Sequence, residues 1–236
     1  MPADVHVPSS VRRLAGTDET RPVWLNEAGG LTFELVTSTG GRFVKWMPAG
    51  DSPIDLAGEA DRLRWASAFT PVPRVLELGS DDDGTWMLTE ALTGENAVSE
   101  PWKSRPAVAV AAIGAGLRAF HDALPVTDCP FRWQPEEGWT PGTPAPPTID
   151  EPVVCHGDSC APNTLIGADG RCSGHVDLGA LGVGDRWADL AIATWSTVWN
   201  YGPGWENLLL DAYGIEPDAE RTAYYRTLWG SEPTSV

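Results

Sequence analysis

Short runs of alternating apolar and polar residues dominate the N-terminal part of the chain and predict β-strands. Leu31 to Thr37 (LTFELVT) and Arg42 to Met47 (RFVKWM) flank Ser38, Thr39, Gly40 and Gly41, a sequence that favours a hairpin turn. Val75 to Leu78 and Thr85 to Thr89 flank the turn-forming SDDDG. The expected product is a small, mostly antiparallel sheet.

One stretch of this part has helical spacing instead. From Asp55 to Phe69 (DLAGEADRLRWASAF) the apolar residues Leu56, Ala60 and Leu63 recur every three or four positions, and Asp55 can cap the first turn. The proline-containing TPVPR then ends the helix. We expect this helix to pack against the sheet.

After Glu90 the pattern becomes helical. Ala107 to His121 predicts a buried helix, and the chain from Arg186 onward reads as helices rich in Trp and Tyr, most of them in the core. The proline-rich stretch Phe131 to Pro152 predicts a surface connector, and the last residues (SEPTSV) predict a disordered tail. The pattern indicates an α+β protein of two lobes, with residues 1–90 forming a sheet-containing lobe and residues 91–236 a mainly helical one.

Composition narrows the function classes. A net charge of −17 excludes a phosphate-backbone partner, because nucleic-acid binding requires clustered Lys and Arg. The acidity could steer a polycationic substrate towards the protein, although general solubility is the preferred explanation. No apolar run is long enough for a membrane span, the N-terminus lacks a signal-peptide core, and four cysteines form no disulfide framework, so we expect a cytoplasmic protein with reduced, mostly buried thiols.

The segment VVCHGDSCAPNTLIGADGRCSGHVD carries the residue types of a phosphoryl-transfer site. Asp158, in a tight glycine turn, can accept the proton of a substrate hydroxyl. Asn163 and Asp177 supply the oxygen ligands that Mg²⁺ prefers, and the short strands expected around them bring the two to adjacent strand ends. His156 is better suited to holding the loop than to acting as the base.

A second set of candidates lies in the N-terminal lobe. Lys45, one of only two lysines, occupies the middle of an apolar strand pattern, and Glu59 on the following helix could pair with it and leave its ammonium positioned for nucleotide phosphates. A lysine that extends along the strand surface is the simpler alternative. Gly29 and Gly30 would let backbone approach a phosphate, or merely form a turn.

The segment GDRWADLA opens a helix. Asp185, Arg186 and Asp189 are expected to support the catalytic loop, with a plain helix cap as the alternative. A zinc site could use the soft ligands Cys155, Cys160, Cys172 and His175, but their spacing lacks the close pairs that are typical of structural zinc. The sequence contains neither a serine nucleophile elbow nor a CxxC redox pair.

Taken in order, these motifs resemble the kinase-like antibiotic phosphotransferases, and most closely the aminoglycoside 3'-phosphotransferase family. The similar stretches are FVKWMP with GEADRLRW, VPRVLELG through MLTEALTGENA, VVCHGDSCAPN, and HVDLGALGVGDRWADLA. The resemblance implies a protein-kinase-like fold, Asp158 as catalytic base, Asn163 and Asp177 as Mg²⁺ ligands, and ATP or GTP as phosphate donor. It also implies that the backbone of Thr89, Glu90, Ala91 and Leu92 binds the purine, and that an aminoglycoside 3'-hydroxyl is the acceptor.

The departures from the family concern the acceptor side. The family commonly has an arginine where this chain has Ala180. It often ends in acidic and aromatic residues where this chain has Leu228, Trp229 and Gly230. The acidic insert of the family is reduced here to the stretch from Gln134 to Asp150. A nucleoside or other glycosylated antibiotic is therefore an alternative acceptor. Two further alternatives are a catalytically silent nucleotide-binding regulator and a zinc-stabilised binding module.

Overall fold

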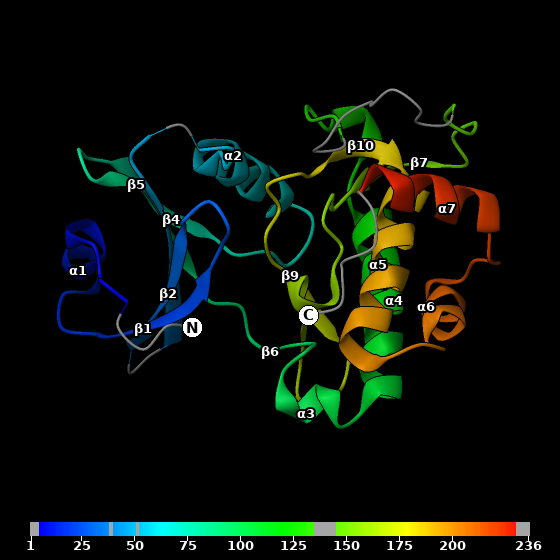
Figure 1. The fold of residues 1–236 in the computed structure, drawn as a ribbon, viewed down its shortest axis with the longest axis horizontal. Helices are drawn as coiled ribbons and strands as arrows, with labels where there is room; N and C mark the ends of the chain where they lie inside the picture. Colours follow the sequence, from blue (N-terminus) through cyan, green and yellow to red (C-terminus); the bar gives the residue numbers. More distant parts are fainter. Residues whose placement is uncertain (1–4, 38–39, 51, 135–144, 230–236) are drawn as a thin grey trace. The chain divides into compact units, whose positions relative to one another are not determined.

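The computed structural model describes residues 5–37, 40–50, 52–134 and 145–229. The expected turn at Ser38 and Thr39, residues 135–144 of the proline-rich connector, Gly230 and the SEPTSV tail lie outside them. The chain divides into two compact units, Met1–Leu92 and Thr93–Val236, here called the N-lobe and the C-lobe. Figure 1 shows the sheet of the N-lobe and the helices of the C-lobe.

The N-lobe is built on a five-stranded antiparallel sheet. Its strands lie in the order β1-β2-β3-β5-β4. They are β1 (Glu19–Leu25), β2 (Leu31–Thr37), β3 (Gly40–Pro48), β4 (Val75–Ser80) and β5 (Gly84–Glu90). The four strands expected from alternation are present, and β1 is an additional edge strand.

The two faces of this sheet differ. On one face Phe33, Leu35 and Val44 form a core with Val11 and Leu14 of α1 (Ser9–Ala15), a short helix that the sequence pattern did not reveal. On the other face packs α2 (Leu56–Ala66), whose first turn is capped by the Asp55 carboxylate accepting from Gly58 N at 2.9 Å. Figure 1 shows the two helices on opposite sides of the strands.

The C-lobe is mainly helical, as expected. Its helices are α3 (Glu100–Lys103), α4 (Pro106–Ala123), α5 (Arg186–Tyr201), α6 (Glu206–Tyr213) and α7 (Ala219–Leu228), with a 3₁₀ turn η1 (Val126–Asp128). The helices α4 and α5 lie side by side and are flanked by α6 and α7 (Figure 1). The part of the chain that the structure describes contains no helix long and apolar enough to cross a membrane.

Short strands present the catalytic segment. A two-stranded sheet pairs β7 (Pro152–Cys155) with β10 (Gly182–Asp185), and a second sheet orders β6 (Glu95–Asn96), β8 (Thr164–Ile166) and β9 (Cys172–His175). Between β7 and β8 lie the loop at 156–160 and the 3₁₀ turn η2 (Ala161–Asn163). The loop and the β8–β9 hairpin are therefore held from both sides by regular structure.

Candidate active site

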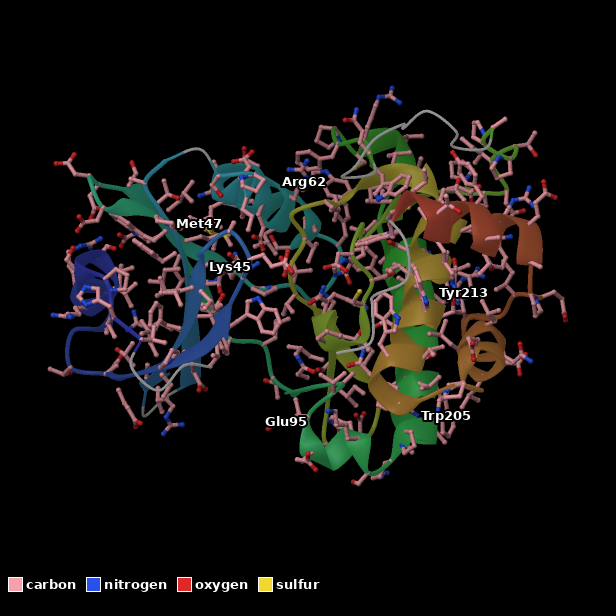
Figure 2. The ribbon with its side chains drawn as sticks, in the orientation of Figure 1. Lys45, Met47, Arg62, Glu95, Trp205 and Tyr213 are labelled. Carbon is pink, nitrogen blue, oxygen red and sulfur yellow. The ribbon has the colours of Figure 1, made fainter. Side chains whose placement is uncertain are left out.

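Lys45 and Glu59 form the predicted ion pair. Lys45 projects from β3 (Figure 2), and its Nζ lies 2.6 Å from Glu59 Oε1 on α2. The Glu59 side chain is only 4% exposed, whereas that of Lys45 is 27% exposed. A buried carboxylate thus fixes an ammonium that still reaches solvent, a geometry suited to binding an anion.

Local packing explains the paired glycines. Asn26 Oδ1 accepts from Gly30 N at 2.7 Å, and Asn26 Nδ2 contacts Met47 Sδ at 3.6 Å. A Cβ on Gly30 would lie 2.1 Å from that sulfur, and Gly29 has a φ of 80°, which favours glycine. The backbone of the turn favours glycine at position 29, a side chain at position 30 would displace Met47 and Asn26, and a phosphate contact there stays a prediction.

The segment expected to bind the purine, Thr89 to Leu92, comprises the last two residues of β5 and the two that follow. The amide of Glu90 donates to Arg74 O at 3.0 Å, and that of Ala91 donates to Gly41 O at 3.0 Å. These two amides are engaged within the N-lobe. A purine contact from Glu90 or Ala91 would therefore use their backbone carbonyls.

Asp158 and Asn163 are linked directly. Asn163 Nδ2 donates to Asp158 Oδ2 at 3.0 Å and to the Asp158 carbonyl at 2.9 Å. The other carboxylate oxygen, Asp158 Oδ1, is buried and forms no hydrogen bond of ordinary geometry within the described residues, although the Cys160 thiol lies close enough to the Asp158 side chain to interact with it. Because a buried acceptor normally finds a donor, this oxygen is suited to receive one from a ligand.

His156 and Gly157 shape the loop that carries Asp158. The fully buried His156 accepts from Asp158 N at Nδ1 (3.3 Å), so its Nε2 carries the proton donated to Val176 O (3.0 Å). Gly157 has a φ of 88°, and a Cβ there would lie 2.3 Å from the carbonyl oxygen of Ala180. His156 is placed as a scaffold, as the sequence suggested.

Asp177 follows β9 directly and has an unusual backbone. Its φ of 67° makes it the one non-glycine residue with positive φ in the described ranges. Val176 N donates to Asn163 O at 3.0 Å, and Thr164 pairs with His175, so Asn163 and Asp177 lie at adjacent strand ends. Strained backbone of this kind concentrates at functional sites.

The donor set fits Mg²⁺. With the amide nitrogen of Asn163 on Asp158, its Oδ1 is the atom available as a hard ligand, together with the Asp177 carboxylate. No group of three or more His, Cys, Asp and Glu side chains in the described residues could hold a metal alone. A cation here would therefore draw further oxygen ligands from nucleotide phosphates and water.

A buried hub behind the loop centres on Asp189 of α5. Asp189 Oδ2 accepts from His156 N (2.6 Å), Oδ1 accepts from Gly157 N (2.9 Å), and the Asp189 carbonyl accepts from Ser159 Oγ (2.7 Å). Burial by itself raises the pKa of Asp189, but the hydrogen bond and charge of His121, the charge of His156 and the Gly157 amide lower it below its ordinary value. Asp189 therefore binds the backbone of the loop that carries Asp158, and its role in supporting catalysis stays a prediction.

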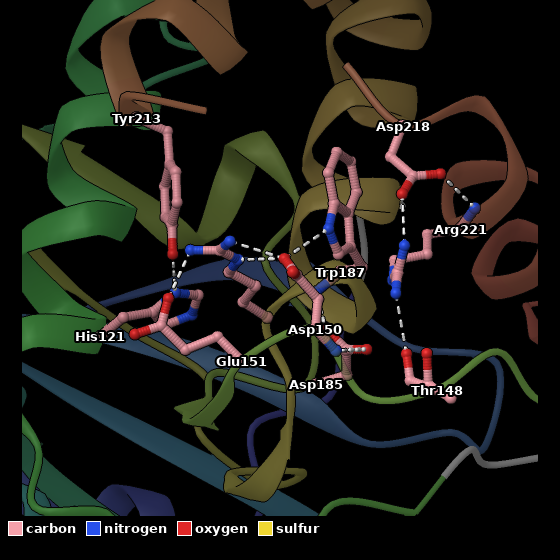
Figure 3. A network of polar contacts seen from close by, with 10 residues as sticks. His121, Thr148, Asp150, Glu151, Asp185, Trp187, Tyr213, Asp218 and Arg221 are labelled. Carbon is pink, nitrogen blue, oxygen red and sulfur yellow. Dashed lines mark hydrogen bonds and ion pairs between the residues drawn. The ribbon is translucent and has the colours of Figure 1, made fainter. Parts of the chain in front are cut away.

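The same hub contains two residues that the sequence pattern did not single out. His121 of α4 places Nε2 2.9 Å from Asp189 Oδ2 and Nδ1 2.8 Å from the hydroxyl of Tyr213 on α6. Figure 3 shows the contact between His121 and Tyr213. His121 lay inside an apolar helix pattern, and no local spacing links it to residues 68 and 92 positions away.

Asp185 is the helix cap that was the alternative interpretation of this segment, and support of the catalytic loop by Asp185 and Arg186 stays a prediction. Asp185 caps α5 by accepting from Trp187 N at 3.1 Å and also accepts from Asp150 N at 3.1 Å. Arg186 forms ion pairs with Asp150 and Glu151. Both residues hold the chain that enters β7, and their described bonds do not reach the loop of Asp158.

The cysteines are free thiols that do not form the zinc site considered from the sequence. Cys172 Sγ lies 3.9 Å from His175 Nε2, and burial raises the pKa of Cys172 to about 11. Burial, and then the charges of His156 and His121, lower the pKa of His175 to about 3. Only Cys155 is fully buried, the other three being half-buried.

The fold and the site place the chain among kinase-like phosphotransferases. Over 93% of this chain and 95% of the other, it superposes with a TM-score of 0.75 and 29% identity on the crystal structure of an aminoglycoside 3'-phosphotransferase of type VIII. Aminoglycoside phosphotransferase APH(3'')-Id of Streptomyces rimosus, in complex with ADP and streptomycin, gives a TM-score of 0.71 at 26% identity, covering 92% of this chain and 94% of that one. The expected fold class, a protein-kinase-like pair of lobes, is confirmed.

The sequence comparison identifies the family. The model of the phosphotransferase enzyme family (APH) matches residues 25–145 and 142–225. An aminoglycoside 3'-phosphotransferase of Streptomyces fradiae is 34% identical over 93% of this chain and 97% of its own length. The chain therefore belongs to the phosphotransferase enzyme family, as its motifs suggested.

Proposed function

We propose that this protein transfers the γ-phosphate of ATP or GTP to a hydroxyl of an aminoglycoside antibiotic and thereby confers resistance. One observation carries the chemistry: the buried Asp158 Oδ1, without a hydrogen bond of ordinary geometry in the described residues, belongs to a loop that Asp189 holds rigidly. The family assignment and the similarity to aminoglycoside phosphotransferases support the acceptor.

The N-lobe is the nucleotide-binding part of this proposal. Lys45, held by Glu59, binds the phosphates of the donor, and the segment Thr89 to Leu92 binds its purine. Gly29 and Gly30 bring backbone close to the phosphates. The resident cofactor is Mg²⁺, held by Asn163 and Asp177 of the C-lobe.

The C-lobe is the catalytic part. The acceptor hydroxyl donates to Asp158 Oδ1, its oxygen attacks the γ-phosphorus, and the bond to the bridging oxygen of the nucleoside diphosphate breaks. The hydroxyl proton passes to Asp158 and then to solvent. When bound, Mg²⁺ neutralises phosphate charge, and the remaining catalysis comes from positioning by this loop.

We favour the 3'-hydroxyl as acceptor, because the relative with 34% identity is a 3'-phosphotransferase. The net charge of −17 suits a polycationic antibiotic. The nucleoside-antibiotic and silent-regulator alternatives find no support among these relatives, which are named as aminoglycoside-modifying enzymes.

A mass-shift assay tests the proposal. The protein is incubated with Mg²⁺ and ATP or GTP, and with an aminoglycoside that has a 3'-hydroxyl, its 3'-deoxy counterpart, streptomycin, or a nucleoside antibiotic. We expect phosphate on the first compound only. Phosphate on streptomycin alone would contradict the choice of hydroxyl, and phosphate on the nucleoside alone would contradict the acceptor class.

The mechanism is tested by Asp158→Asn. This variant should bind ADP normally but lose about a hundredfold or more in turnover, because it lacks the proton acceptor. Asp169→Asn is the matched control, since Asp169 is an exposed acid of the same segment. Undiminished turnover by Asp158→Asn would exclude Asp158 as the base.

A further inference from the structure

The peptide bond between Pro162 and Asn163 is held at both of its polar groups. Its N–H belongs to Asn163 and donates to Cys160 O at 2.9 Å, an interaction that closes the 3₁₀ turn η2. Its carbonyl belongs to Pro162 and accepts from Asn96 Nδ2 at 2.8 Å. Because the peptide group is planar, it cannot rotate without breaking one of these hydrogen bonds. The Asn163 side chain therefore starts from a backbone of fixed direction.

The other polar groups of Asn163 are also engaged. Its carbonyl accepts from Val176 N at 3.0 Å, directly before Asp177 in the chain. Its Nδ2 donates to the Oδ2 atom and to the carbonyl of Asp158, at 3.0 and 2.9 Å. The atom that all these contacts orient is Asn163 Oδ1, the proposed Mg²⁺ ligand.

Asn96 differs from the other partners of Asn163 in its place in the chain. The others belong to the same segment as Asn163, residues 153–177. Asn96 belongs to β6 (Figure 1), where it pairs in register with Leu165 of β8. Strand β6 follows soon after Leu92, the last residue of the segment expected to bind the purine. The peptide before the proposed metal ligand is thus anchored by a distant part of the sequence.

The orientation of the Asn96 amide is determined by its two hydrogen bonds. Its Oδ1 accepts from Val98 N at 2.8 Å, so its NH₂ group is the one that faces the Pro162 carbonyl. The next residue, Ala97, donates from its backbone N to Thr164 O at 2.9 Å. Asparagine suits this position because it accepts on one side and donates on the other, which a carboxylate cannot do.

We infer that Asn96 is a positioning residue for the cation: it holds the Pro162 carbonyl and thereby keeps Asn163 Oδ1 directed at the metal. The inference rests on the proposed function, which assigns Mg²⁺ to Asn163 and Asp177, and adds a residue of β6 that acts through Asn163. Residues that hold a metal ligand in place typically contribute about 10–100-fold to metal affinity or activity.

The test measures Mn²⁺ binding to the complex of the protein with ADP by electron paramagnetic resonance, because Mn²⁺ accepts the same oxygen ligands as Mg²⁺. In Asn96→Asp the carboxylate still accepts from Val98 N but cannot donate to Pro162 O. We expect Mn²⁺ binding and kcat to fall about tenfold, while the affinity for ADP without metal is unchanged. Asn207→Asp, the same substitution at an exposed asparagine of α6, is the matched control and should change none of these quantities.

A double variant tests whether Asn96 acts through Asn163. Asn163→Ala alone should weaken Mn²⁺ binding, and the addition of Asn96→Asp should weaken it no further. Additive losses would overturn the inference, as would unchanged Mn²⁺ binding by Asn96→Asp beside a weakened Asn163→Ala. An equal loss of metal-free ADP binding by Asn96→Asp would indicate a general loss of structure and would also overturn it. A wild type whose ADP complex binds no Mn²⁺ would instead contradict the proposed function.

Discussion

His121 Nε2 and Asp189 Oδ2 lie 2.9 Å apart, and both side chains are at most 1% exposed. The contact joins α4 to α5 directly behind the loop that carries Asp158. The Asp189 carboxylate also accepts hydrogen bonds from the amides of His156 and Gly157. The orientation of the loop that carries Asp158 therefore depends on a histidine whose side-chain hydrogen bonds, within the described residues, go to Asp189 and Tyr213.

Removing this histidine should loosen the loop. His121→Phe leaves Asp189 with one donor fewer in a buried site, so we expect a loss of about 1–3 kcal/mol in the free energy of unfolding and reduced kcat. Urea denaturation and steady-state kinetics measure the two effects. Asp122→Asn, at an exposed position of the same helix, should change neither.

Gly157 should not tolerate a side chain. Gly157→Ala adds a Cβ 2.3 Å from the Ala180 carbonyl at a residue with a φ of 88°, so the loop must move. We expect a destabilisation of at least 1–2 kcal/mol from the φ alone and loss of turnover. Gly179→Ala is the control for stability, because no atom lies within 4 Å of the added Cβ. Equal melting temperatures of the two variants would contradict this account.

Two substitutions of Asp177 distinguish the effect of its carboxylate charge from the effect of its left-handed backbone. Asparagine tolerates the left-handed region about as well as aspartate, whereas alanine does not. Asp177→Asn should therefore keep the stability of the wild type, while Asp177→Ala loses about 1 kcal/mol. Both should weaken Mg²⁺-dependent turnover by more than the roughly 10–100-fold typical of outer-shell partners. A Mg²⁺ titration of activity checks this, and an unshifted titration would exclude Asp177 as a ligand.

Acid should destabilise the C-lobe in two ranges of pH. The pKa of His175 falls from 6.5 to about 3 on folding. Between these two pH values the imidazole is protonated in the unfolded chain and neutral in the folded one. The free energy of unfolding therefore declines as pH drops below 6.5. The pKa of Asp189 is also lowered on folding. The contribution of its ionised carboxylate to the free energy of unfolding is therefore lost as pH falls below the ordinary pKa of 3.8.

The slope from His175 is at most about 1.4 kcal/mol per pH unit. Denaturant unfolding between pH 7.5 and about 4 measures it, and His175→Phe should flatten the curve. His6→Gln, at an exposed histidine, is the control. A His175→Phe curve as steep as that of the wild type would rule out this origin.

Regular local patterns made much of the fold predictable. The capped start of α2 and the alternation in β2, β3 and β5 needed no tertiary information. Strand β1 was not predicted, because Pro22 and the bulge at Val23 interrupt the alternation of apolar and polar residues. As an edge strand it also has few buried positions to mark it. Strand β10 (GVGD) is too short and glycine-rich to give a pattern.

Within the candidate site, the sequence predicted contacts between residues that are close in the chain and missed contacts between residues that are far apart in it. Asp158, Asn163 and Asp177 lie in one segment, and the Lys45–Glu59 pair joins neighbouring elements. The His121 contacts cross between helices, and the partners of Arg186 at 150 and 151 depend on where the chain enters β7. Only packing reveals such relationships.

The bulge in β1 also indicates where the length of the chain can change. Because the register is intact on both sides of Val23, a deletion of that residue would preserve every pairing of β1 with β2. A deletion of one residue within β2 would instead shift its pairing with both neighbours and turn Thr32 towards the core. Homologous chains that differ in length here should therefore carry their insertions and deletions in the edge strand.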